Sequence, residues 1–315
     1  MKKNSPTCIQ YAILATIIVP IIFLTGCQIW RHVGVSSATT LASRQYMQQA
    51  VESLQLNEEN TARQKLELAL KTNPENMEAR AMYADVLWDI GEQEKAISEL
   101  KQVVDSPEVS PATYVKLARM YYDTLQWEIS QKYLSEALRR DSSRSDAWTL
   151  QGRLYLTSFH TEKAASAFHQ AIFYNPENWE AFLLLSDLYL TDQKPQRALE
   201  TVQYVRHKFP PDQEPPEVLY REGLAMCALG RFSEAVETLT LADSRMPQEI
   251  NILSALAHAQ YNAGKTADAL HTAELAINIM PENEMCLNLL RHIHREGISV
   301  DIHPQIGNQP LLKSP

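Results

Sequence analysis

Residues 145–178 read SDAWTLQGRLYLTSFHTEKAASAFHQAIFYNPEN, and this stretch decides the fold. Its apolar residues recur every three or four positions in two runs, one containing Trp148, Gly152 and Tyr155 and the other starting at Ala164. Such spacing places the apolar residues on one face of an α-helix. The stretch therefore predicts two amphipathic helices that pack against each other as a hairpin.

The same pattern of 34 residues occurs seven times between residues 43 and 283. Two columns of small residues mark it, at the eighth and twentieth places of each repeat. The eighth-place residues are Ala50, Ala84, Ala118, Gly152, Ser186, Gly223 and Ala257, and the twentieth-place residues are Ala62, Ala96, Ser130, Ala164, Ala198, Ala235 and Ala269. We therefore expect two helices to approach closely at both places. The expected repeats are residues 43–76, 77–110, 111–144, 145–178, 179–212, 216–249 and 250–283.

Residues 145–178 resemble the tetratricopeptide repeat, whose W-x2-L-G-x2-Y, A-x3-F and P signature they follow except that Gln151 replaces the leucine. Five repeats carry the closing proline, as Pro74, Pro176, Pro210, Pro247 and Pro281. Glu108 and Ser142 occupy that place in the other two repeats. The resemblance covers residues 43–283. It implies an all-α fold, an α-solenoid of seven helical hairpins.

The ends and joints of this array also have sequence signals. Gly91, Gly230 and Gly264 mark the turn between the two helices in three repeats. Stacked hairpins need a cover on the last exposed face, and residues 284–296 predict that capping helix. Residues 297–315 predict a disordered tail. The insertion at residues 213–215 predicts either an interruption of the stack or a neutral lengthening of a loop.

The N-terminus has the order of an export signal. Lys2 and Lys3 precede an apolar run from Ile9 to Leu24. The following Leu24-Thr25-Gly26-Cys27 resembles a bacterial lipobox, which implies cleavage of residues 1–26 and acylation, with palmitate among the lipids, at Cys27. Residues 27–42 would then be the lipidated cysteine and a flexible tether. An uncleaved signal anchor is the alternative, since the segment from Cys8 to Cys27 is long enough to span a membrane.

Both interpretations put the array beyond the inner membrane, facing the periplasm. Gln28 follows the expected lipidation site, and a residue other than aspartate there favours the outer membrane in the enterobacterial sorting pattern.

Composition excludes several classes of function. The chain has a net charge of −9, and removal of residues 1–26 makes it −11, so nucleic acid is not expected as a partner. The sequence Gly264-Lys265-Thr266 lacks the earlier glycine of a phosphate-binding loop. His292 and His294 are two residues apart and point to different sides of a helix, so they are not expected to share a metal ion. We expect no enzyme activity, no cofactor and no metal. Cys227 and Cys286 are expected to be packing residues without a disulfide.

The remaining candidate is a binding surface. In this family the first helices line a concave groove, which the second, fifth, ninth, twelfth and thirteenth places mainly face. The candidate residues stand at the fifth, ninth and twelfth of these places. These residues are Asp85, Trp88, Arg119, Tyr122, Arg153, Leu156, Asp187, Leu190, Tyr220 and Tyr261. An extended peptide or a partner helix would suit such a seam. Alternatively, the twelfth-place residues contact the next repeat and the ninth-place charges pair with one another.

The sequence therefore predicts a non-catalytic, membrane-tethered adaptor that binds envelope proteins or peptides. The resemblance implies a part in the assembly of a pilus, secretion or cell-wall complex. A structural envelope lipoprotein that associates with copies of itself is the alternative.

Overall fold

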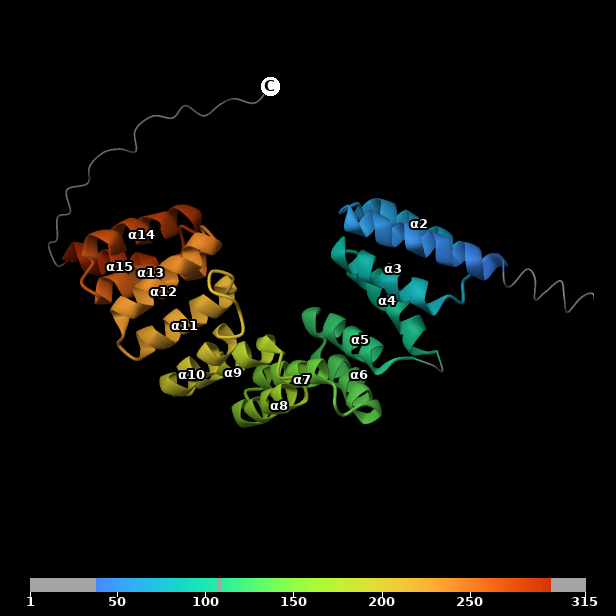
Figure 1. Ribbon diagram of the computed structural model, residues 1–315, viewed down its shortest axis with the longest axis horizontal. Helices are drawn as coiled ribbons and strands as arrows, with labels where there is room; N and C mark the ends of the chain where they lie inside the picture. Colours follow the sequence, from blue (N-terminus) through green and yellow to red (C-terminus); the bar gives the residue numbers. More distant parts are fainter. Residues whose placement is uncertain (1–37, 107–108, 296–315) are drawn as a thin grey trace, which may run out of the picture. The chain divides into compact units, whose positions relative to one another are not determined.

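The computed structural model describes residues 38–106 and 109–295, in which every regular element is an α-helix. The chain divides into two compact units, Met1–Ser142 and Ser143–Pro315, which are called the N-terminal and the C-terminal unit below. Figure 1 labels the helices along the chain. The predicted all-α solenoid of helical hairpins is confirmed.

Each repeat contributes one hairpin. The N-terminal unit contains a helix at residues 38–55, followed by α2 (Glu59–Thr72), α3 (Met77–Asp89), α4 (Gln93–Val104), α5 (Pro111–Asp123) and α6 (Trp127–Arg140). The C-terminal unit contains α7 (Ser145–Thr157), α8 (Thr161–Tyr174), α9 (Trp179–Thr191), α10 (Pro195–Arg206), α11 (Pro216–Ala228), α12 (Phe232–Arg245), α13 (Ile250–Asn262), α14 (Thr266–Ile279) and α15 (Glu284–Arg295).

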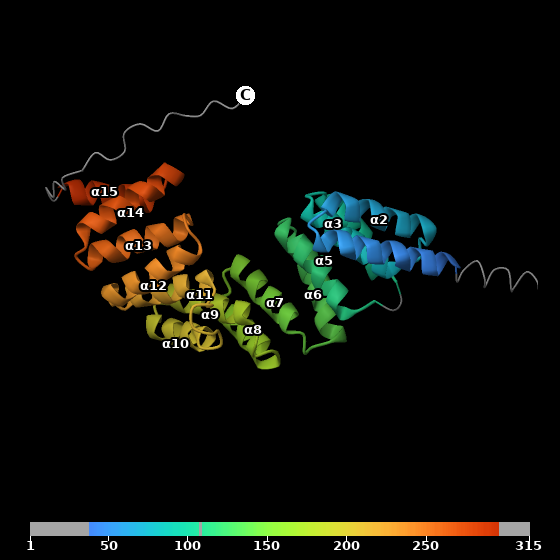
Figure 2. The same cartoon turned by 45° about the horizontal axis from the view of Figure 1, so that its top comes forward.

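The last helix, α15, closes the C-terminal unit as a cap. It contacts both α13 and α14, as Figures 1 and 2 show. Its inner face buries Cys286 and Ile293, while Met285 is half exposed. The capping helix lies where the sequence predicts it.

The first described helix begins earlier than the sequence analysis predicts. Residues 38–42 are helical, so this part of the expected tether is wrong. No glycine or proline stands between residues 35 and 55 to end the helix on its N-terminal side. The expected signal peptide, Cys27, the rest of the tether and the tail at residues 297–315 lie outside the described residues.

The hairpins are held together at the eighth and twentieth places. All seven twentieth-place residues are fully buried, and so is Ala118 at the eighth place. A Cβ atom built on Gly152 would lie 2.3 Å from Cε1 of Phe168, closer than packed atoms approach. These side chains are small because the opposite helix occupies the space.

Two serines fit this contact because each hydroxyl group donates a hydrogen bond to a main-chain carbonyl of the opposite helix. Ser130 Oγ donates to the Ala118 carbonyl at 2.7 Å, and Ser186 Oγ donates to the Ala198 carbonyl at 3.2 Å. Each bond joins the eighth place to the twentieth place of the same hairpin. A buried hydroxyl without such a partner would be costly, so the bond explains why serine replaces alanine here.

The turn between the two helices has the same backbone in all seven repeats. The fifteenth-place residue is left-handed, with φ between 58° and 85°, in Asn57, Gly91, Leu125, Phe159, Gln193, Gly230 and Gly264. The next residue donates its N–H to the eleventh-place carbonyl, for example His160 to Tyr155 at 2.9 Å, which closes the first helix. The glycine signal therefore identifies three of the seven turns.

A second repeated set of hydrogen bonds links successive hairpins. Asn178, at the last place of repeat four, accepts from the Ala181 N–H at 3.1 Å and so caps α9. Its Nδ2 donates to Ser145 Oγ at 2.7 Å, and Ser145 in turn donates to the Ala171 carbonyl at 2.7 Å. Asn76 with Ser43, in repeat one, forms the same arrangement.

The insertion at residues 213–215 does not interrupt the packing. Ala198 and Leu199 of α10 share one buried cluster with Ala225 of α11. Glu214 is only 8% exposed and pairs through Oε2 with Arg245 Nη2 at 2.8 Å. Burial disfavours the charged form of this carboxyl, but hydrogen bonds from its own backbone and from Arg245 outweigh burial and lower its pKa. The inserted glutamate therefore ties this loop to α12.

We predict that Gly152→Ala destabilises the protein by up to about 2 kcal/mol. Overpacking against the fully buried Phe168 costs about 1–3 kcal/mol, and the better helix former offsets about 1 kcal/mol of that cost. The measurement is the urea midpoint of the full chain. In the control Gly152→Ala/Phe168→Leu, which recreates the Ala118 and Leu134 pairing of repeat three, stability should recover. An unchanged midpoint in the single variant would contradict the close contact.

Candidate binding surface

The first helices form a row within the C-terminal unit. Helix α9 contacts α11, and α11 contacts α13. The residues that the sequence analysis proposes for binding belong to these first helices and to α3, α5 and α7. We call the side of each unit that carries them the first-helix surface of that unit. Asp85, Trp88, Arg119 and Tyr122 lie in the N-terminal unit, and Arg153, Leu156, Asp187, Leu190, Tyr220 and Tyr261 lie in the C-terminal unit.

Half-buried apolar side chains form the centre of this surface in the C-terminal unit. Leu190, Tyr220 and Cys227 all pack against one buried cluster, which includes Met226 and Leu256. Each remains partly exposed on its other side. The structure therefore brings these three residues together, and they serve both the packing between repeats and an accessible surface.

The other apolar candidates have separate surroundings. Leu156 packs against a cluster that contains Phe168 and Leu188. Tyr261 meets the ring of His292 edge to face, with 5.5 Å between the centroids, so the cap contributes to this end of the surface. Trp88 and Tyr122 are half buried on α3 and α5.

Three of the four ninth-place charges, Asp85, Arg153 and Asp187, pair with residues of the next repeat. Asp85 accepts from Lys116 Nζ at 2.6 Å in the N-terminal unit. In the C-terminal unit, Arg153 Nη2 lies 2.6 Å from Glu180 Oε1. Arg119 is exposed and forms no ion pair with any residue of its unit that the structure describes.

Asp187 pairs with one guanidinium through both of its carboxylate oxygens. Arg221 Nε lies 2.9 Å and 3.0 Å from its two carboxylate oxygens. Burial raises the pKa of Asp187 above the ordinary value, although the guanidinium of Arg221 acts in the opposite direction. These ion pairs leave little uncompensated charge at the centre of the surface. Sequence spacing alone misses the partners because Glu180 and Arg221 stand at the second and sixth places of the following repeats.

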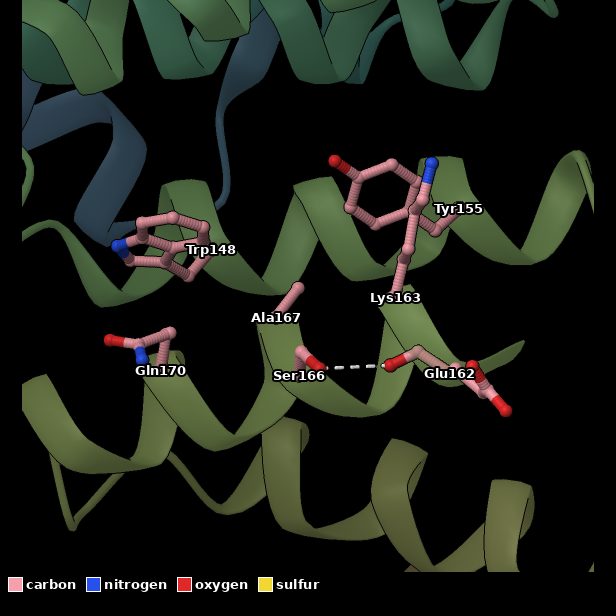
Figure 3. Close-up of a pocket in the computed structure, with 7 residues that line it drawn as sticks. All are labelled: Trp148, Tyr155, Glu162, Lys163, Ser166, Ala167 and Gln170. Atoms are coloured by element: carbon pink, nitrogen blue, oxygen red, sulfur yellow. Dashed lines mark hydrogen bonds between the residues drawn. The ribbon is translucent and has the colours of Figure 1, made fainter. Parts of the chain in front are cut away.

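A pocket of about 580 Å³ lies on another face of the C-terminal unit, on α7 and α8. Figure 3 shows Trp148 and Tyr155 of α7 above Ala167 of α8, with polar side chains on the α8 side. Its lining residues are Trp148, Tyr155, Glu162, Lys163, Ser166, Ala167 and Gln170. We call this site the α7–α8 pocket. None of its residues belongs to the predicted binding set, although Trp148 and Tyr155 carry the repeat signature.

Two polar groups of this pocket have identified contacts within it. Ser166 Oγ donates to the main-chain carbonyl of Glu162 at 3.0 Å, so its hydroxyl proton is engaged by backbone. Lys163 Nζ lies 5.8 Å from the centroid of the Tyr155 ring, a cation–π distance. Across the described residues, no group of three or more His, Cys, Asp or Glu side chains is placed to hold a metal ion.

Two further findings concern the expected anchor and the cysteines. Among the helices described, none has the length and apolar character needed to cross a bilayer. Cys227 and Cys286 are both free thiols. Burial raises the pKa of Cys227 to about 11.

Comparison with protein families gives two matches. A model described as a tetratricopeptide repeat-like domain matches residues 10–185, more than half of the chain. A tetratricopeptide repeat model matches residues 159–213. No curated protein sequence matches this chain.

Several solved structures have a similar fold. A tetratricopeptide repeat protein from Parabacteroides merdae is 12% identical with a TM-score of 0.60, covering 80% of this chain and 98% of its own. Pseudomonas aeruginosa pilF is 17% identical with a TM-score of 0.58, covering 68% and 96%. The C-terminal part of a repeat protein from Cytophaga hutchinsonii is 15% identical with a TM-score of 0.53, covering 70% and 89%. At these identities the similarity establishes the fold alone.

We predict that the Cys227 thiol reacts slowly with alkylating reagents in the folded protein. A pKa of about 11 in place of 9.0 reduces the thiolate fraction at pH 8 by about 100-fold, and the thiolate is the reactive form. The measurement is the rate of iodoacetamide labelling at Cys227, resolved by peptide mass spectrometry. Labelling in 8 M urea is the control and should be fast. Equal rates with and without urea would show that the thiol is not shielded.

Proposed function

Because the chain belongs to the tetratricopeptide repeat-like domain family, we propose that it is a non-catalytic scaffold that binds a partner polypeptide on its first-helix surface. The observation that carries this proposal is the group formed by Leu190, Tyr220 and Cys227. These side chains rest on a buried core and expose their outer sides. A rigid apolar strip of this kind suits an extended peptide or an amphipathic helix.

The charges beside this strip bear on how a partner is recognised. Arg153 and Asp187 are already paired with Glu180 and Arg221. A partner carboxylate would therefore have to compete with an existing ion pair. We infer that apolar contact supplies most of the affinity and that the paired charges set the register, so binding should depend weakly on salt.

The non-catalytic part of the proposal rests on the arrangement of the polar groups. The described residues contain no assembled metal ligands, and Ser166 of the α7–α8 pocket hydrogen-bonds to backbone. Catalysis by a nucleophile needs a base within hydrogen-bonding distance of it. The fold is of a type that generally serves as a scaffold.

We further propose that a lipid on Cys27 tethers this scaffold in a bacterial cell envelope, facing the periplasm and attached to the outer membrane. The support is the sequence Leu24-Thr25-Gly26-Cys27 after an apolar run, followed by Gln28. The layout of a tethered repeat array suits the assembly of a pilus, secretion or cell-wall complex. Envelope proteins or peptides are the partners we expect.

We predict site-specific photocrosslinking at Leu190 but not at Tyr204. Both residues are replaced by p-benzoylphenylalanine in separate variants, and the chain is irradiated in cells. Leu190 belongs to the first-helix surface, whereas Tyr204 on α10 is 49% exposed elsewhere and is the matched control. The expected result is a discrete adduct at position 190 that Tyr220→Ala reduces at least fivefold. Equal adducts at both positions would contradict the proposed surface, and an adduct with a second copy of the chain would favour self-association.

Labelling with radioactive palmitate tests the anchor separately. The wild-type chain should carry the label and fractionate with membranes, whereas Cys27→Ser should lose the label. Cys8→Ser is the control, because Cys8 lies in the segment expected to be removed. Label that persists in Cys27→Ser would exclude this cysteine as the lipid site without affecting the binding proposal.

A further inference from the structure

A pocket of about 400 Å³ lies within the N-terminal unit, between the hairpins of repeats two and three. Its lining includes Glu94, Ile97, Lys101 and Asp105 from α4 and its C-cap, and Tyr121 from α5. Helices α4 and α5 contact each other inside this one unit. We call this site the α4–α5 pocket. It shares no residue with the first-helix surface of either unit.

Tyr121 is the most deeply buried residue of this lining that has a polar group. It is only 6% exposed, and the ring of Tyr133 stacks on it with 5.5 Å between the centroids and planes 2° apart. Its hydroxyl group forms no hydrogen bond with any residue in the described part of the chain. Burial raises the pKa of Tyr121 above its ordinary value, so the hydroxyl keeps its proton at neutral pH. A buried hydroxyl without a partner is costly, and a polar group bound in the pocket can supply that partner.

Asp105 places a carboxylate where the helix itself does not favour one. It is the C-cap of α4, and the last carbonyl groups of a helix give that end a partial negative charge. Asp105 is exposed and forms no ion pair with residues 38–106 or 109–142, although Lys101 lies one turn before it. Burial raises the pKa of Tyr133, and the charge of Asp105 raises it further, so this carboxylate lies near the tyrosine pair. A cation bound here would meet both the carboxylate and the end of the helix.

Glu94, the other acid of the lining, has a structural explanation. It stands in the first turn of α4, where a negative charge stabilises the helix. We therefore assign it no binding role.

Two other repeats place a cation over the tyrosine at the eleventh place. Lys163 Nζ lies 5.8 Å from the centroid of the Tyr155 ring in repeat four, and the guanidinium carbon of Arg197 lies 6.0 Å from that of Tyr189 in repeat five. Both cations come from the nineteenth place of their repeat. Repeat three has Ile129 at that place, so its tyrosine receives no cation from there. A partner can supply the cation that repeat three lacks.

We propose that the α4–α5 pocket accepts an arginine side chain of a partner polypeptide, with its alkyl stem on Ile97 and its guanidinium between Tyr121 and Asp105. A guanidinium is planar, so it can pack on an aromatic ring while its N–H groups donate to a carboxylate and a hydroxyl oxygen. Arg140, which lies 4.5 Å from the centroid of the Tyr114 ring, shows the same pairing inside this unit. The net charge of −9 also favours approach of a basic segment.

Binding of short peptides to the full chain tests the proposal. The probes are the capped peptides Gly-Ser-Arg-Ser-Gly and Gly-Ser-citrulline-Ser-Gly, followed by ligand-observed NMR. Citrulline keeps the shape of arginine without its charge, and we expect the arginine peptide to bind at least fivefold more tightly. Asp105→Asn should weaken the arginine peptide at least fivefold. Asp89→Asn is the matched control and should leave binding unchanged, because Asp89 is also exposed at a helix C-terminus but lies at the opposite end of the same hairpin.

Two further variants separate the roles of the lining residues. Tyr121→Phe removes only the hydroxyl group and should weaken the arginine peptide at least threefold. Lys101→Gln removes a competing positive charge and should strengthen its binding at least twofold.

Three outcomes would overturn the proposal. The first is equal binding of the two peptides, and the second is unchanged binding in both Asp105→Asn and Tyr121→Phe. The third is loss of binding in Tyr220→Ala, since the peptide would then occupy the first-helix surface. Crosslinking at Leu190 should persist in Asp105→Asn, so the two binding proposals can fail separately.

Discussion

The close approach of two helices at the eighth and twentieth places is the contact on which the whole array depends. It is fully buried at the twentieth place in every repeat. Because the backbones are so near, the second helix buries its inner face without large side chains at this point. Leu100 and Leu134 then fill the space one turn further along the second helices of repeats two and three. The spacing of 34 residues repeats because each hairpin must offer the same contact.

This constraint explains why the fold could be predicted from the sequence and several details could not. Small residues at a fixed period indicate closely packed backbones, so the hairpins and the capping helix can be predicted from the sequence. Leu125 and Phe159 are different. They adopt a left-handed backbone that glycine favours, and they are 73% and 92% exposed, so neither turn preference nor burial selects them. The hydrogen bond from the following N–H to the eleventh-place carbonyl imposes that conformation.

The candidate site was only partly predictable for a similar reason. The period assigns Leu190 and Tyr220 to the first-helix surface, and they do lie together there. It does not identify the partners of the ninth-place charges, because Arg221 reaches Asp187 from the next repeat through a side-chain geometry that spacing leaves open. The α7–α8 pocket was missed for a sharper reason. Trp148 and Tyr155 carry the repeat signature, so the sequence assigns them to packing of the hairpin and not to the wall of a pocket.

The insertion before α11 shows how the array tolerates a departure from its period. Three extra residues would be expected to loosen the joint, yet Glu214 is buried and held by Arg206 and Arg245 from α10 and α12. Glu222, at 2% exposure, also pairs with Arg206 at 2.6 Å. Two buried carboxylates thus face two guanidinium groups, and removal of either arginine would leave a buried charge uncompensated. Residues of α10 and α11 share one buried cluster across this joint, so the ion pairs hold the longer loop against the array without loosening the packing.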